Sequence, residues 1–313
     1  MIYITAQPRI KFYAWQVEVM INNFIKNKVD PASIHVLVGW NSENETALEI
    51  NSKPWEKLSE KYKEVKFFQY PDSRSTPVVY VSSIRPHILA KHFEQYPELE
   101  KEVFLYHDCD VALTKEIDFS NHLKDDVWYG SDTGSYLNSQ YILSKGKDVL
   151  DLMCSIVGID PSIVERNSSG TIGAQYILKK IDSSFWLKVE RDSVALFDQV
   201  TKLNNQKILS IPDYHPLQIW CADMWAVLWN GWLRGIETRV SESMSFCWPN
   251  QPLEKWESSA FFHNSGVLDD QSNMFYKGKY MYALPYGSRD IVNEHTCSYK
   301  YYQEIKAVDS CLY

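Results

Sequence analysis

The first 110 residues alternate between short apolar runs and longer segments whose apolar residues recur every three or four positions. The short runs predict strands at residues 2–5, 34–38, 65–70 and 103–106. The longer segments predict helices at residues 12–27, 54–63 and 82–96, with Pro54 in the first turn of the second and Ser82 or Ser83 capping the third. Strands and helices that alternate in this way form a parallel sheet with crossover helices. Ligands of such sheets bind at the carboxyl ends of the strands, so a site is expected just after Tyr106.

The second half of the chain is less regular. Residues 127–130 predict one more strand, and residues 148–157, 182–203 and 216–233 predict helices, whereas residues 246–313 show short aromatic segments without a clear period. No internal repeat and no linker rich in Gly and Ser divides the chain. The pattern therefore predicts an α/β fold with a mixed, mostly parallel central sheet flanked by helices, in which residues 1–313 share one core with a soft boundary near residue 135.

Composition narrows the class of protein. The 313 residues carry a formal net charge of −8, 45% are apolar and 14% are aromatic. This excludes an intrinsically disordered chain, and the acidic balance disfavours a general nucleic-acid coat protein while leaving a local basic groove open. The aromatic residues fit either a large core or a surface that stacks on sugars or bases. The six cysteines form no CxxC pair, so we expect most of them to be reduced and buried.

The N-terminal residues read as a strand and show no basic segment followed by an apolar stretch, which is the pattern of a secretion signal. No run of 18 uninterrupted apolar residues predicts a membrane span. We therefore expect a cytoplasmic protein, in the host cytoplasm if the source is a virus.

The strongest chemical signal follows the fourth predicted strand. Asp108 and Asp110 are spaced i and i+2, which in an extended chain puts both carboxylates on one side, roughly 6.6 Å apart along the strand. Two convergent carboxylates repel each other, and a divalent cation such as Mg²⁺ or Mn²⁺ removes that cost while also binding phosphate oxygens. The pattern favours metal and nucleotide binding, with a polar turn at the end of a strand as the alternative.

The nucleotide-binding first half and the segment Tyr106-His107-Asp108-Cys109-Asp110 together resemble the GT-A glycosyltransferases, which use a nucleotide sugar and a DxD motif. The resemblance implies that Asp110 binds Mn²⁺, which grips the donor diphosphate, and that Asp108 contacts the donor near its ribose or sugar and joins the metal site. It also implies that residues 1–135 form a nucleotide-sugar-binding half and residues 136–313 an acceptor-binding half of a single catalytic domain.

Two later segments extend the resemblance. Residues 261–267 (FFHNSGV) are similar to the HN(A/S)G element of some GT-A enzymes, which implies that His263 is a third protein ligand of the metal. The alternative is a histidine with a backbone partner. Residues 170–176 (GTIGAQY) resemble a Gly-Gly-Ala-Gln stretch of hydroxyproline arabinosyl- and peptidyl-serine galactosyltransferase-like enzymes and of phage-type glycosyltransferases. There the glycines would let the backbone approach the donor sugar and Gln175 would touch it, although Ile172 interrupts the glycine pair. A loop leading into a helix is the alternative.

Asp223 is the only charged residue between Pro216 and Leu233, a segment that is apolar on all helical faces, and such a helix is buried. A buried carboxylate needs a partner, so Asp223 pairs with a base such as Arg234, belongs to a polar network, or lines a cavity. In a cavity it would serve as the general base for an acceptor hydroxyl, while His215 is a weaker candidate for that role.

Three basic residues are candidates for binding the donor diphosphate, whose charge grows as the bond to the sugar breaks. Lys277 and Lys279 lie shortly after the histidine element, and Arg85 lies near the start of the third predicted helix. The alternative for each of them is a solvated surface charge.

The sequence therefore predicts a metal-dependent hexosyl- or pentosyltransferase that moves a sugar from a nucleoside-diphosphate sugar to an acceptor hydroxyl. Asp223 would be the base if the reaction inverts the sugar, and Gln175 would support the sugar's front face if it retains it. The resemblance to phage-type enzymes implies DNA modification at a hydroxymethylated base. The resemblance to the arabinosyl- and galactosyltransferase-like enzymes implies a protein acceptor, and a glycan is a third choice. A nucleotidyltransferase and a non-catalytic sugar-binding module are the rival hypotheses.

Overall fold

The computed structural model describes residues 1–41, 45–266 and 273–313, and for residues 45–50 it describes the backbone alone. The chain forms two compact units, each assembled from separate segments. The first unit comprises Met1–Pro71, Leu105–Asn121 and Glu242–Tyr313, and the second comprises Asp72–Phe104 and His122–Ser241. Both units draw on residues before and after 135, and the predicted assignment of donor and acceptor roles to residues 1–135 and 136–313 stays a prediction.

Seven strands form a mostly parallel sheet, which confirms the predicted mixed α/β class. The strands of the first unit lie in the order β3-β2-β1-β4 and are β1 (Ile2–Pro8), β2 (Ile34–Trp40), β3 (Lys66–Pro71) and β4 (Phe104–His107). β1 pairs with β2, and β2 with β3, in parallel. In the second unit the order is β7 (Ile172–Leu178), β6 (Trp128–Asp132), β8 (Thr238–Val240), with β6 antiparallel to β7 and parallel to β8.

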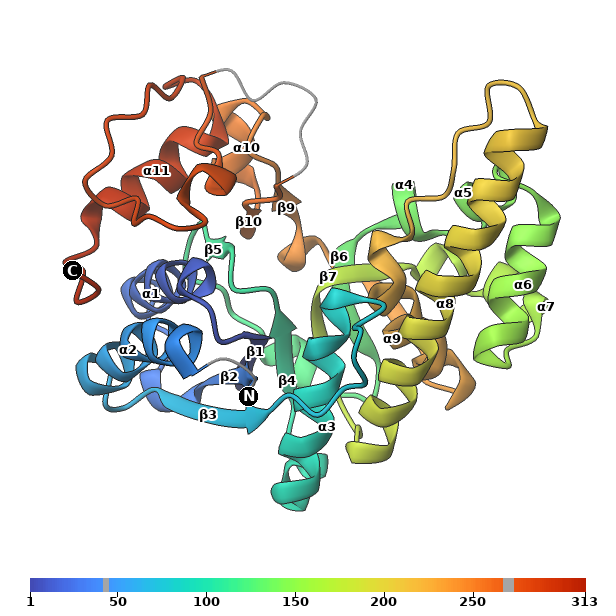
Figure 1. Ribbon diagram of the computed structural model, residues 1–313, viewed down its shortest axis with the longest axis horizontal. Coiled ribbons are helices and arrows are strands. Elements are labelled where there is room, and N and C mark those ends of the chain that lie inside the picture. Colours follow the sequence, from blue (N-terminus) through green and yellow to red (C-terminus); the bar gives the residue numbers. More distant parts are fainter. Residues whose placement is uncertain (42–44, 267–272) are drawn as a thin grey trace. The chain divides into compact units, whose positions relative to one another are not determined.

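The first unit also holds a small sheet in which β10 (Phe261–His263) lies between β5 (Val111–Leu113) and β9 (Phe246–Cys247). Its helices are α1 (Lys11–Lys26), α2 (Glu45–Lys61), α10 (Leu253–Ser258) and α11 (Cys297–Ala307). Figure 1 shows α1 and α2 side by side next to the strands β1 to β3. The indole of Trp15 on α1 is fully buried and packs edge-on against Phe275 and Tyr280 from the C-terminal segment. This aromatic packing ties the C-terminal segment to α1.

The second unit is built around the long helix α8, which packs against α3, α6 and α9 (Figure 1). Its helices are α3 (Ile84–Gln95), α4 (Gly134–Leu137), α5 (Ser139–Leu143), α6 (Lys147–Val157), α7 (Pro161–Arg166), α8 (Ser183–Ser210) and α9 (Ala222–Leu233). The indoles of Trp225, Trp229 and Trp232 on α9 are buried, as the apolar pattern predicts. The predicted helix starts too early, however, because residues 219–221 form a 3-10 turn in which Trp220 is half-exposed.

Three further local interpretations differ from the structure. Pro54 lies inside α2, which begins at Glu45, and not in the first turn of a helix. Ser83 occupies the N-cap of α3 without capping it, since its hydroxyl donates to Tyr80 O and accepts from Arg74. Residues 172–178 form the buried strand β7 and not a loop.

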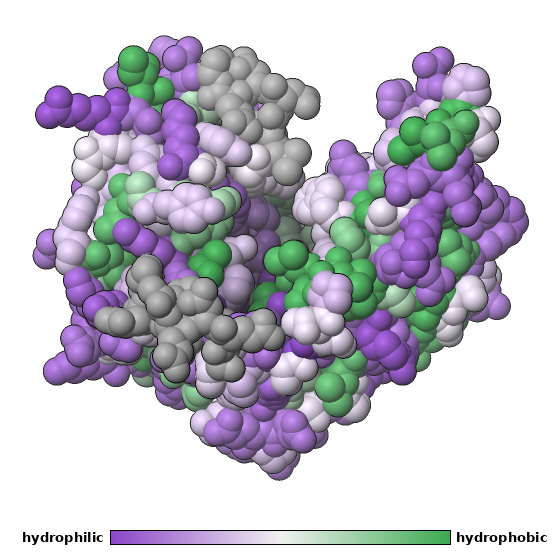
Figure 2. Space-filling model, viewed as in Figure 1, coloured by the Kyte–Doolittle hydropathy of each residue, from purple (hydrophilic) through white to green (hydrophobic). Residues whose placement is uncertain are grey.

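No helix in the described part of the chain combines the length and the apolar character that crossing a bilayer requires. All six cysteines are free, and five of them are buried. Figure 2 shows hydrophobic residues gathered at the surface over the segment that joins β3 to α3, where Val79 and Val81 are exposed.

Candidate metal centre

Asp108 and Asp110 lie in the turn that joins β4 to β5, both in the first unit. All four residues of β4 are buried, so the turn begins where the strand leaves the core. The imidazole of His107, the last residue of β4, donates from Nδ1 to the carbonyl oxygen of Asp108 at 2.8 Å. Burial lowers the pKa of His107 to about 4, so this ring is neutral at physiological pH. A neutral, buried ring thus fixes the backbone at the first aspartate.

His263 reaches the aspartates through strand pairing. β10 runs antiparallel to β5, and His263 lies directly opposite Val111, the residue after Asp110. The register continues beyond the strand, because the backbone N–H of Asn264 donates to the carbonyl oxygen of Asp110 at 2.9 Å. The chain segment after β4 and the segment around residue 263 are therefore held together by the main chain, independently of their side chains.

The three side chains converge on one point. His263 Nε2 lies 3.5 Å from Asp110 Oδ1 and 3.7 Å from Asp108 Oδ2, and one ligand atom from each residue lies within 4.8 Å of the other two. An ion of the size of Mg²⁺ holds its ligands at about 2.1 Å, which puts neighbouring ligand atoms roughly 3 Å apart and opposite ones roughly 4 Å apart. The two distances from His263 lie within this range, so the two carboxylates and the imidazole fit a divalent cation. We call these three residues the Asp-Asp-His cluster.

Lys277, at the start of a 3-10 turn over Lys277–Tyr280, forms an ion pair with Asp110 Oδ2. The side chain of Asp110 is 8% exposed, and burial alone would raise its pKa. The charges of Lys277 and His263 and the hydrogen bond from Lys277 outweigh burial and hold the pKa of Asp110 below its usual value. The carboxylate is therefore ionised and ready to bind a cation at neutral pH.

Neighbouring residues hold the cluster in place. The side chain of Asn23 on α1 accepts from the backbone N–H of Leu113 at 2.7 Å and donates to its carbonyl oxygen at 3.1 Å, which pairs the free edge of β5. The indole of Trp248 stacks on His263, with ring centroids 5.6 Å apart and planes inclined by 27°. A side chain at Gly266 would come within 3.1 Å of Lys277 Cε. Glycine at that position leaves room for the lysine that contacts Asp110.

Asp223 lies in the second unit, in the first turn of α9, and is 5% exposed. Its Oδ2 pairs with the guanidinium of Arg85 on α3 at 2.5 Å, and its Oδ1 accepts from Tyr80 Oη at 2.7 Å. Burial and the negative charge of Asp223 raise the pKa of Tyr80 well above its usual value, so the phenol stays protonated. Pairing with a basic side chain was one of the alternatives for Asp223 and is the one observed, but the base is Arg85 and not Arg234, which pairs with Asp182.

The remaining predicted residues occupy other environments. Gln175 lies in β7 with no exposed surface and accepts a hydrogen bond from Ser131 Oγ at 2.7 Å. Lys279 forms an ion pair with Asp290 at 3.5 Å and is more than half-exposed. His215 is exposed in the segment before α9. Of the two lysines predicted to bind the donor, Lys277 contacts the Asp-Asp-His cluster and Lys279 contacts Asp290.

Sequence reasoning missed three residues that support these sites. His107 is adjacent to the aspartate pair, and its position at the end of an apolar run was an available signal. Trp248 and Tyr80 gave no such signal, because aromatic residues are common along the whole chain. Their partners, His263 and Asp223, are 15 and 143 residues away, respectively.

No protein-family model matches the sequence, and no curated protein is similar to it. Among solved structures, the bifunctional glycosyltransferase WbbM is 8% identical with a TM-score of 0.48, and the match covers 99% of this chain and 50% of that one. The chain thus spans half of the length of WbbM. LgtC, as an active-site mutant, is 11% identical with a TM-score of 0.46, covering 99% and 97%. Mouse xyloside xylosyltransferase 1 is 10% identical with a TM-score of 0.40, covering 85% and 98%. At these scores the function must be inferred from the site itself.

Proposed function

We propose that the chain is a metal-dependent glycosyltransferase that moves a sugar from a nucleoside-diphosphate sugar to an acceptor hydroxyl. The observation that carries this proposal is the Asp-Asp-His cluster at the carboxyl end of β4. An α/β sheet binds its ligands at that end of its strands, and two carboxylates with an imidazole supply a ligand set suited to Mn²⁺ or Mg²⁺. The GT-A resemblance of the DxD and HNSG segments supports the same assignment.

The residues of the first unit are proposed to bind the metal and the diphosphate of the donor. Asp108, Asp110 and His263 would hold the cation, which supplies positive charge to the departing diphosphate. Lys277 is already at the cluster and carries a second positive charge that can move from Asp110 Oδ2 to a phosphate oxygen. Asp108, with a third of its side chain exposed, is the member of the cluster that a ligand can reach most readily.

The residues of the second unit are proposed for the sugar and the acceptor. Asp223 is the proposed base for the acceptor hydroxyl, and Arg85 is a proposed donor contact. Because they form an ion pair, the two side chains must act together: moving one of them leaves the charge of the other without a partner. Gln175 is proposed to support the sugar through the strand β7 that holds it. The acceptor proposed first is a hydroxymethylated DNA base, with a protein or glycan hydroxyl as the alternative.

Metal-dependent stabilisation by a nucleoside diphosphate tests the donor half of this proposal. Melting temperatures of the wild type are measured with UDP, GDP, ADP, CDP and their sugar conjugates, each with and without Mn²⁺. We expect one nucleotide to raise the melting temperature only with the metal, because the cation bridges the carboxylates and the phosphates. At 100 times Kd the stabilisation amounts to about 2.7 kcal/mol, which is several degrees for a chain of this size.

Asp110→Ala should abolish the shift, and Asp126→Asn is the matched control, because Asp126 is exposed and its carboxylate pairs with the exposed Lys180. The donor is then incubated with the protein and candidate acceptors, and free nucleoside diphosphate is measured. A response to nucleoside triphosphates with pyrophosphate release would favour a nucleotidyltransferase instead. Sugar binding that changes neither with the metal nor with Asp110→Ala would favour a non-catalytic sugar-binding module.

A further inference from the structure

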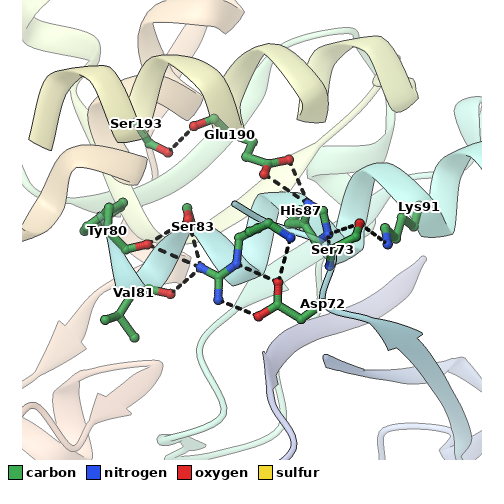
Figure 3. Close-up of polar contacts among 10 residues, drawn as sticks. Asp72, Ser73, Tyr80, Val81, Ser83, His87, Lys91, Glu190 and Ser193 are labelled. Carbon is green, nitrogen blue, oxygen red and sulfur yellow. Dashed lines mark hydrogen bonds and ion pairs between the residues drawn. The ribbon is translucent and has the colours of Figure 1, made fainter. Parts of the chain in front are cut away.

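A serine, a histidine and a glutamate are aligned in the second unit, among residues to which the proposed transfer gives no role. Figure 3 shows Ser73 beside His87, with Glu190 reaching the same ring from α8. Ser73 Oγ lies 3.2 Å from His87 Nε2, and His87 Nδ1 lies 3.0 and 3.1 Å from the two carboxylate oxygens of Glu190. We call these residues the Ser73–His87–Glu190 triad. A nucleophile, a base and a group that orients the base are the three parts of covalent acyl-transfer catalysis.

The contacts of His87 fix the tautomer that such catalysis needs. The backbone N–H of Ser73 also lies 3.2 Å from His87 Nε2, and an amide N–H can only donate. Nε2 must therefore carry its lone pair, which places the ring proton on Nδ1, facing Glu190. A lone pair on the nitrogen next to the serine, with the opposite N–H held by a carboxylate, is the arrangement in which histidine accepts a proton from serine.

A cation touches the nucleophile itself. Lys91 Nζ, one turn after His87 on α3, donates to Ser73 Oγ at 2.8 Å. This contact favours the alkoxide form of the hydroxyl. The negative oxygen that forms when Oγ attacks a carbonyl is bonded to the atom next to Oγ, so an ammonium group that already reaches Oγ can also reach that oxygen.

The loop that carries Ser73 is held in place from its other side. The guanidinium of Arg74 forms two hydrogen bonds of 2.9 Å with Asp72 and one of 2.9 Å with Ser83 Oγ. Burial would raise the pKa of Asp72, but its bonds with Arg74 lower it, so the pair is ionic. Asp72 and Arg74, the residues on either side of the serine, thus pair with each other. Neither needs the serine hydroxyl as a partner, so the hydroxyl can react with an incoming molecule.

The triad lines a pocket of about 410 Å³ whose wall combines apolar side chains with polar and charged ones. Ser73 is exposed, His87 is nearly buried, and the wall includes Pro77, Val79 and Leu187. Figure 2 shows hydrophobic surface over this same loop, and Val79 and Leu187 are each at least half-exposed. A volume of this size fits a small molecule, and because the charges of Arg74, Lys91, Glu94 and Glu190 in its wall sum to zero, the wall suits an uncharged one.

We propose that the Ser73–His87–Glu190 triad is a second reactive centre, which hydrolyses small uncharged carboxylic esters. Ser73 Oγ bonds to the carbonyl carbon while its proton passes to His87 Nε2. The ester C–O bond then breaks, and the alcohol leaves with that proton. Water attacks the acyl-serine, gives its proton to His87, and releases the carboxylic acid, after which the proton returns to Ser73. This activity goes beyond the proposed sugar transfer and uses residues of one unit only.

A fluorophosphonate probe tests the nucleophile directly, because the serine oxygen displaces fluoride and keeps the phosphonyl group. The full-length protein is labelled in EDTA, so that the result does not depend on the metal site, and peptide mass spectrometry locates the adduct. We expect the adduct on Ser73 and its loss in Ser73→Ala. Ser75→Ala is the matched control, because Ser75 lines the same cavity. An adduct spread over several surface serines, or none on Ser73, would overturn the proposal.

The base and its orienting group are tested by rate. Hydrolysis of p-nitrophenyl butyrate should fall at least 10-fold in Ser73→Ala and in His87→Gln, and about as far in Glu190→Gln. Glu190→Asp should restore part of the lost labelling rate, whereas a role confined to holding α3 and α8 together would change the melting temperature and leave the labelling rate unaffected. Melting temperatures of all variants are measured alongside. If His87→Gln does not fold, the labelling of Ser73→Ala decides the question, because labelling of that variant at the wild-type rate would overturn the proposal.

Discussion

Asp110 and Asp223 are both buried carboxylates paired with one basic side chain, yet their surroundings differ. Asp110 shares its site with a second carboxylate and an imidazole, so two carboxylates face the single ammonium group of Lys277. The carboxylate of Asp223 accepts from Arg85 and Tyr80, and Arg85 balances its charge. A site with surplus negative charge and spare lone pairs is suited to a cation, whereas a balanced pair stabilises the fold by itself and changes only when a ligand replaces one partner.

The largest effect that separates the two carboxylates is on stability. Asp223→Asn should lower the free energy of unfolding by about 3 kcal/mol, because it leaves the guanidinium of Arg85 largely buried without its counter-charge. Urea unfolding at neutral pH measures the change. Asp182→Asn is the control, since Asp182 pairs with Arg234 at a more exposed site and the asparagine can still cap α8, so the expected loss there is below 1 kcal/mol. Equal losses in the two variants would mean that burial of the Asp223 pair is unimportant.

A smaller effect concerns pH and acts at Asp110. Its folded-state pKa lies below the ordinary value of 3.8, so its ionised form adds stability that is fully present above pH 3.8 and is lost as the pH falls through the folded pKa. Removing the charged hydrogen bond with Lys277 in Asp110→Asn should cost about 2 kcal/mol at most at pH 6. The difference between wild type and variant should narrow below pH 4 in urea titrations. A difference that grows toward acid would show that the pKa is raised and that burial dominates.

The two regions also differ in how far the sequence predicts them. Asp108 and Asp110 follow an apolar run that forms β4, and strand pairing places His263 opposite Val111, so a local pattern and one register determine the cluster. The partner of Asp223 is Arg85, 138 residues away on another helix, and no periodicity encodes that contact. Proximity in sequence favoured Arg234, which pairs elsewhere.

The loop interpretation of residues 170–176 was wrong for a different physical reason. The glycines of residues 170–173 predict a loop, but the apolar run after them forms β7, and the loop-like feature survives only as an irregularity within it. Ala174 adopts a positive φ of 60°, and the pairing register with β6 shifts between Gly130 and Ser131. The glycines correctly indicated an irregular backbone near residue 174. Because the apolar residues around it are buried in the sheet, the irregularity occurs within a strand and not in a loop.

The smallest effect sharpens the comparison at the cluster. Lys277→Met removes a positive charge beside Asp110, so Mn²⁺ alone should bind roughly fivefold more tightly, a change of about 1 kcal/mol, in calorimetric titrations. The same variant should bind a nucleoside diphosphate with Mn²⁺ more weakly than the wild type, since the proposed phosphate contact is lost. Lys279→Met is the matched control, because Lys279 pairs with Asp290 and should change neither affinity. Weaker binding of Mn²⁺ alone in Lys277→Met would mean that the lysine orders the carboxylates for the metal, and that the surplus negative charge of the cluster is not what attracts the cation.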